Sequence, residues 1–146
     1  AAIGLSQFKR LSIMIAIRTY NRNKIIKTLK KSKNWNEQFI FFNQKKNLRP
    51  SWFGLPLLVN PELEKHKDKF LKFLNKNNLE TRPIISGNFI NQPAINLYDI
   101  KFKKNELKNS NIIDKRGFFI GLPTVKLNQE KVDKISNLLL SLSNFK

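Results

Sequence analysis

The side chains best suited to binding a polar ligand gather in one short stretch, ETRPIISGNFINQPA, at residues 80–94. Arg82 stands among threonine and isoleucine, and an arginine can bind a phosphate or a carboxylate through paired hydrogen bonds. Gly87 follows, and the amide side chains of Asn88 and Gln92 come close behind it. Such a junction between strand and loop often presents polar groups to a ligand, although a simple connection that needs a flexible glycine has the same composition.

An aromatic residue earlier in the chain extends this candidate site. Trp52 begins an apolar segment, where a tryptophan more often packs in the core than stacks on a ligand. Together with Arg82 and the amides, however, an aromatic ring fits the recognition of a polar, phosphate-bearing molecule such as a nucleotide sugar.

Other kinds of chemistry have little support. His66 is the only histidine, it lies in the charged segment EKHKDKF, and the chain has no cysteine. A catalytic triad or a zinc site within these residues is therefore not expected. The ten acidic residues lack the spacing of a metal-binding loop, and neither common glycine-rich phosphate motif is present. We predict no catalytic residue and no metal site in this chain.

The net charge of +18 raises the alternative of a basic nucleic-acid-binding domain. The lysines are scattered along the whole chain, as an AT-rich coding sequence would also produce, and form no arginine-rich block. Arg116-Gly117-Phe118 resembles the start of an RNA-binding signature, but Phe119 and Ile120 then break the match. We therefore expect no sequence-specific nucleic-acid partner.

The pattern of apolar residues predicts an α/β domain with a sheet covered by helices. Helices are expected at residues 1–31, from 60 onward, at 93–98 (or a turn), at 106–116 and at 128–142. Strands are expected at residues 39–42, 51–59, 79–85 and 118–122, with Pro56 indicating an edge position or a bulge. Residues 1–31 would form a connecting helix, and residues 32–146 the small domain proper.

The chain opens without a helix-capping residue or an initiator methionine, which suggests a piece of a longer protein. No apolar run reaches the ~20 residues of a membrane span, and the start lacks the pattern of a signal peptide. We expect a cytoplasmic location and no membrane partner.

Four motifs in order give a specific resemblance: AAIGLSQFKRL, PSWFGLPL, TRPIISGNFINQPA and GFFIGLPT. They resemble the C-terminal part of the DegT/DnrJ-type sugar aminotransferases, which are pyridoxal-phosphate enzymes of the aspartate aminotransferase fold acting on nucleotide-linked keto-sugars. The motifs SWFG and GN…QP look most similar to the nucleotide-sugar 3-dehydrases and related aminotransferases that make deoxysugars for lipopolysaccharide O-antigens.

The resemblance implies a fold, a site and partners. The fold would be the small C-terminal domain of that enzyme class, with a short, mainly antiparallel sheet. Arg82, Gly87, Asn88, Phe89 and Gln92 would face the substrate or a partner subunit of a homodimer, and Trp52 remains a further candidate. The partners would be a nucleotide-linked keto-sugar and a missing N-terminal cofactor domain.

The resemblance also implies that the Schiff-base lysine and the phosphate-binding loop lie in that missing domain. This chain alone is then expected to bind no pyridoxal phosphate and to lack catalysis, and a non-enzymatic dimerisation relic is a further alternative. Because a small core has few spare hydrogen-bonding partners, we expect the amides of Asn88 and Gln92 to point toward the missing neighbour.

Overall fold

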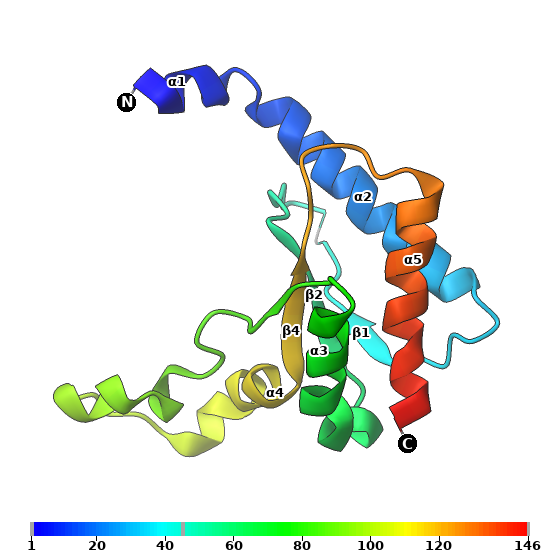
Figure 1. Cartoon of the computed structure of the whole chain (residues 1–146). Coiled ribbons are helices and arrows are strands. Elements are labelled where there is room, and N and C mark those ends of the chain that lie inside the picture. Colours follow the sequence, from blue (N-terminus) through cyan, green and yellow to red (C-terminus); the bar gives the residue numbers. More distant parts are fainter. Residues whose placement is uncertain (1, 45, 146) are drawn as a thin grey trace.

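The computed structural model describes residues 2–44 and 46–145 and contains a four-stranded antiparallel sheet in the order β1-β2-β4-β3 (Figure 1). The strands are β1 (Phe39–Phe41), β2 (Gly54–Val59), β3 (Thr81–Arg82) and β4 (Gly117–Gly121). The α-helices are α1 (Ala2–Phe8), α2 (Leu11–Lys31), α3 (Lys67–Lys76), α4 (Lys108–Arg116) and α5 (Gln129–Leu140). Short 3₁₀ helices lie at Pro61–His66, Phe89–Asn91, Pro93–Leu97, Lys104–Leu107 and Ser141–Phe145. The predicted antiparallel α/β fold is confirmed.

The core lies between one face of the sheet and the helices α2, α3 and α5. Alternate residues of β2 and β4 point into it, because successive side chains of a strand face opposite sides. The sheet contributes Leu55, Leu57, Val59, Phe118 and Ile120, and the helices contribute Ile25, Leu29, Phe70, Leu74, Val132 and Leu139, all with at most 1% of their surface exposed. Burial of these apolar side chains stabilises the fold.

Several element boundaries differ from the sequence prediction. The first helix is not continuous, since a turn at Lys9 and Arg10 separates α1 from α2, and none of the residues of α1 is buried. The strand expected at 79–85 shortens to Thr81–Arg82. Pro56 is in an inner strand, but β1 reaches only Leu57 on that flank, so the proline lies where β2 has a strand partner on one side only.

Polar side chains of α2 attach the loop between β4 and α5 to the core. Asn21 is completely buried; its Nδ2 donates to the carbonyl oxygens of Pro123 (3.1 Å) and Val125 (2.9 Å), and its Oδ1 accepts from the backbone N–H of Leu127 (3.0 Å). Every polar atom of this amide is therefore used, as a buried amide requires. Hydrogen bonds from Asn21, and not apolar packing by that residue, hold the loop against α2.

Arg22 of α2 stacks on Trp52, two residues before β2. The guanidinium carbon of Arg22 lies 4.2 Å from the centre of the Trp52 ring, and Arg22 donates hydrogen bonds to the Phe42 carbonyl and to Asn23 Oδ1. Burial lowers the pKa of the Arg22 guanidinium. The sequence allowed either a core role or a ligand-binding role for Trp52. In the structure Trp52 is half-buried and packs against the core and against Arg22.

None of the helices in the described part of the chain is long and apolar enough to cross a lipid bilayer.

Candidate functional site

The face of the sheet turned away from the core carries a row of three paired residues. Pro56 pairs with Phe119 of β4, and Phe119 pairs with Arg82 of β3, so the three project to the same side. Beside this row lies the pair Gly54 and Gly121. A Cβ atom on Gly54 would come within 2.5 Å of the Phe119 ring, so the ring lies directly over that glycine.

A hollow of about 360 Å³ opens beside Phe119, and we call it the Arg82 hollow. Its lining residues are Arg18, Phe53, Glu80, Arg82, Phe119, Gly121, Leu122 and Pro123. The Phe53 and Phe119 rings lie 5.7 Å apart and form its apolar wall. Two guanidinium groups and one carboxylate flank this wall, which is a surface suited to a ligand with both a flat apolar part and an anionic part.

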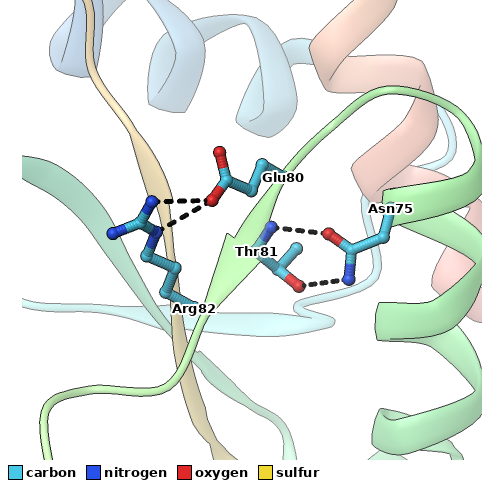
Figure 2. Close-up of polar contacts among 4 residues, drawn as sticks. All are labelled: Asn75, Glu80, Thr81 and Arg82. Carbon is cyan, nitrogen blue, oxygen red and sulfur yellow. Dashed lines mark hydrogen bonds and ion pairs between the residues drawn. The ribbon is translucent and has the colours of Figure 1, made fainter.

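The charged groups of the hollow are held from two different elements. Arg18 reaches it from α2, where its Nε donates to the Leu122 carbonyl oxygen at 3.2 Å. Arg82 is paired with Glu80: its Nη2 lies 2.8 Å and its Nε 2.9 Å from the same carboxylate oxygen. Figure 2 shows both side chains on one side of the strand. They are 61% and 72% exposed, so a ligand can compete for either group.

A second hollow of about 190 Å³ shares the Phe53 and Phe119 rings with the Arg82 hollow. Trp52 lines it together with Phe53, Phe119 and Ile85. Two of the sequence-predicted site residues, Arg82 and Trp52, therefore line neighbouring hollows. The turn at Ile85 is unusual, because this β-branched residue has a φ of 48° and is 90% exposed.

The other predicted site residues lie in the loop that follows β3, against α4. Gly87 has a φ of 60°, and a Cβ atom there would lie 2.7 Å from the Asp114 Cα atom. Asn91 donates to a carboxylate oxygen of Asp114 at 2.7 Å. Phe89 is 46% exposed. The loop is thus ordered by α4, and it is not part of the Arg82 hollow.

The prediction that the amides point toward a missing neighbour is wrong for this loop. Asn88 is only 3% exposed; its Nδ2 donates to Asn111 Oδ1 at 2.7 Å and its Oδ1 accepts from the backbone N–H of Ile90. Gln92 donates to the Ser86 carbonyl oxygen at 3.2 Å. The physical argument about satisfied amides holds, but the partners come from the loop itself and from α4.

We expect Asn88→Ala to reduce the free energy of unfolding by about 1–3 kcal/mol, because it leaves the Asn111 amide without its buried partner and removes the cap of the short helix Phe89–Asn91. Urea unfolding monitored by circular dichroism measures this change. Asn109→Ala, at an exposed position of α4, is the matched control. Equal small effects in both variants would contradict a structural role for Asn88.

The sequence profile of the DegT/DnrJ/EryC1/StrS aminotransferase family matches residues 1–140. The chain belongs to this family. Among curated proteins, it is 26% identical over 138 residues to the GDP-4-keto-6-deoxy-D-mannose 3-dehydratase of Escherichia coli O55:H7 and 30% identical over 139 residues to the enzyme of that name from Yersinia pseudotuberculosis. Each match covers 94% of this chain but only 34% and 33% of the relative, so the chain spans about a third of their length.

Solved structures agree with this assignment. The E. coli 3-dehydratase with bound hydrated PLP superimposes with a TM-score of 0.78 at 26% identity, over 94% of this chain and 34% of that one. A Helicobacter pylori aminotransferase of pseudoaminic acid biosynthesis gives a TM-score of 0.76 at 18% identity, over 97% of this chain and 36% of that one, and supports the fold alone. The predicted membership of the aspartate aminotransferase class is confirmed.

Sequence reasoning missed several residues that shape the Arg82 hollow, namely Arg18, Phe53, Glu80 and Phe119. Phe53 and Phe119 stand within the family motifs SWFG and GFFIG, inside the segments predicted as strands. Their position in those motifs was the available signal, since alternation along a strand puts one residue of each adjacent pair on the open face.

A lysine that reacts with the cofactor is commonly desolvated in an apolar pocket, whereas no lysine whose side chain the structure describes is buried. The same part of the chain also contains no cluster of three or more metal-binding side chains.

We expect this chain to form no specific adduct with pyridoxal phosphate. After incubation with the cofactor and reduction with borohydride, peptide mapping should find slow, substoichiometric labelling spread over many exposed lysines. Labelling of one lysine at a ratio of one per chain would show that the prediction is wrong. The same chain, unfolded in urea and treated in parallel, gives the level of non-specific labelling.

Proposed function

We propose that this chain is the small domain of a pyridoxal-phosphate-dependent enzyme that removes the C3 hydroxyl group of a nucleotide-linked 4-keto-6-deoxy sugar, in the synthesis of deoxysugars for lipopolysaccharide O-antigens. The observation that carries the proposal is the match over 94% of the chain to two GDP-4-keto-6-deoxy-D-mannose 3-dehydratases. A relative in lipopolysaccharide biosynthesis, from Salmonella typhimurium, is 28% identical over 123 residues. The cofactor supplies the electron sink of such reactions when it is bound.

In this proposal the chain's own residues bind and orient the nucleotide sugar. Arg18 and Arg82 supply two cationic donors at the rim of the Arg82 hollow, where the diphosphate of the substrate would bind through charge-assisted hydrogen bonds. Phe53 is 64% exposed and offers a flat apolar surface to a sugar or base ring. Glu80 can accept a hydrogen bond from a hydroxyl group once Arg82 turns to the phosphate.

The exposed apolar residues fit a domain that is covered by other protein parts in a larger enzyme, which we expect to be a cytoplasmic homodimer. Helix α1 and the segment after β3 extend to the same side of the molecule, away from α5 (Figure 1). Large apolar side chains are exposed on both, with Ile3 at 82%, Phe8 at 71%, Leu97 at 80% and Tyr98 at 60%. Surfaces of this kind mark contacts with other protein parts.

The test is the activity of the polypeptide encoded by the complete reading frame that contains these 146 residues. Purified with pyridoxamine phosphate, it should convert GDP-4-keto-6-deoxymannose to the 3-deoxy product, measured by mass spectrometry. Transfer of an amino group to the sugar without loss of the C3 oxygen would instead support a sugar aminotransferase. Neither product from GDP- or dTDP-linked 4-keto-6-deoxy sugars would overturn the proposal.

A further inference from the structure

The strand that carries Arg82 has little to hold it in place. β3 contains only Thr81 and Arg82, and it is the last strand of the sheet, paired with β4 alone. A strand of two residues with one neighbour makes few backbone hydrogen bonds. A shift of its register by one residue would also move Arg82 to the opposite face of the sheet.

A side chain from α3 binds the edge of β3 that has no neighbouring strand. Asn75 Oδ1 accepts a hydrogen bond from the backbone N–H of Thr81 at 2.8 Å, and Asn75 Nδ2 donates to Thr81 Oγ1 at 3.0 Å. Figure 2 shows the two bonds side by side, with Thr81 directed toward α3 and with Glu80 and Arg82 on the other side of the chain. One amide thus fixes both the main chain and the side chain of Thr81.

The anchor of this contact is rigid. Leu74, which precedes Asn75, is completely buried, and so is Phe70 one turn earlier. Asn78 then adopts a φ of 60°, and the backbone N–H of Leu79 donates to the Leu74 carbonyl oxygen at 3.0 Å, which ends the helix and turns the chain back toward the sheet. The core therefore positions Asn75, and Asn75 positions Thr81.

We propose that Asn75 is a positioning residue of the Arg82 hollow: by clamping Thr81, it fixes the face and the direction in which Arg82 and Glu80 leave the strand. This inference rests on the proposed function, in which Arg82 binds the anionic part of the nucleotide sugar. Asn75 itself touches Thr81 and not the ligand. Because Asn75 is exposed, its loss should leave the core of the domain folded.

The experiment compares nuclear magnetic resonance spectra of the 146-residue chain with those of its variants. In Asn75→Ala the amide hydrogen of Thr81 should exchange about tenfold faster, as expected for the loss of one hydrogen bond of ordinary strength. The Arg82 Nε–H resonance should shift and broaden, because the guanidinium no longer has one defined position. Thr81→Val, which keeps the main-chain bond and loses the side-chain bond, should show a smaller change of the same kind.

Two further variants separate positioning from general loss of stability. Asn75→Asp should restore the Arg82 resonance, because a carboxylate can accept from both the N–H and the hydroxyl group of Thr81. Asn77→Ala removes a different bond at the end of α3, from Asn77 Nδ2 to the Phe73 carbonyl oxygen, and should leave the Arg82 resonance unchanged. If Asn75→Ala and Asn77→Ala gave the same Thr81 exchange rate and the same Arg82 resonance, the inference would be overturned.

A titration with inorganic pyrophosphate tests the proposed function separately. Pyrophosphate should shift the Arg82 resonance in the unmodified chain, bind about 3- to 10-fold more weakly to Asn75→Ala, and bind more weakly still to Arg82→Ala. Equal binding by Arg82→Ala and the unmodified chain would overturn the anion-binding role of Arg82. The positioning role of Asn75 would still be decided by the Thr81 exchange rate and the Arg82 resonance without ligand.

Discussion

Replacing Gly87 with alanine should destabilise this domain by about 3 kcal/mol, a large fraction of the stability of a single domain. Two causes add up at this position. Its φ of 60° is costly for any residue with a Cβ atom, and that atom would lie 2.7 Å from the Asp114 Cα atom and 2.1 Å from a carboxylate oxygen. The oxygen can rotate away, but the Cα belongs to α4 and moves only with the helix.

Gly121→Ala is the matched control for this prediction. Gly121 lies in β4 beside the Arg82 hollow, and a Cβ atom there would meet no atom within 4 Å. Its replacement should change the free energy of unfolding by less than about 1 kcal/mol. Chemical unfolding of both variants measures the difference, and equal stabilities would mean that the loop does not pack on α4 as described.

The second large effect is expected on activity and not on stability. In the complete enzyme, Arg82→Ala should lower kcat/KM for the nucleotide sugar about 100-fold, which corresponds to the loss of a charge-assisted contact worth about 2.7 kcal/mol. The melting temperature should hardly move, because the Arg82–Glu80 pair is largely exposed and such pairs contribute little to folding.

Two variants make this result specific. Arg82→Lys keeps the charge but loses the planar, two-point donor, and should recover only part of the activity. Glu80→Gln removes the negative charge that pairs with Arg82 and should weaken turnover far less than Arg82→Ala does. A loss of stability with near-normal turnover per folded molecule would contradict a ligand-binding role and assign Arg82 to the fold.

The sequence was sufficient for the order and type of most elements, because the apolar pattern reports burial directly. Leu55, Leu57 and Val59 alternate as a strand with one buried face requires, and they line the core. Helix α4 ends at Arg116, as predicted. The break between α1 and α2 was missed, since apolar residues such as Ile3 and Phe8 continue the helical spacing without packing on this domain.

The site was harder to predict because its contacts join residues far apart in the chain. Arg18 and Arg82 line one hollow although 64 positions separate them, and Asn88 finds its partner in Asn111, 23 positions later. Composition shows that an amide needs a partner, but only the fold shows which one it has. Arg82, predicted from its residue type and its family motif, lies in the hollow, while Asn88 lies outside it.

Helix α2 would tilt about a point close to the Arg82 hollow, because its buried part begins just after Arg18. Its buried part begins at Asn21 and Arg22, three residues after Arg18 and ten residues after Leu11. At 1.5 Å per residue, a tilt about Asn21 that displaces Leu11 by about 3 Å displaces Arg18 by only about 1 Å. A displacement at the start of α2 is therefore expected to reach the Arg82 hollow reduced to about a third.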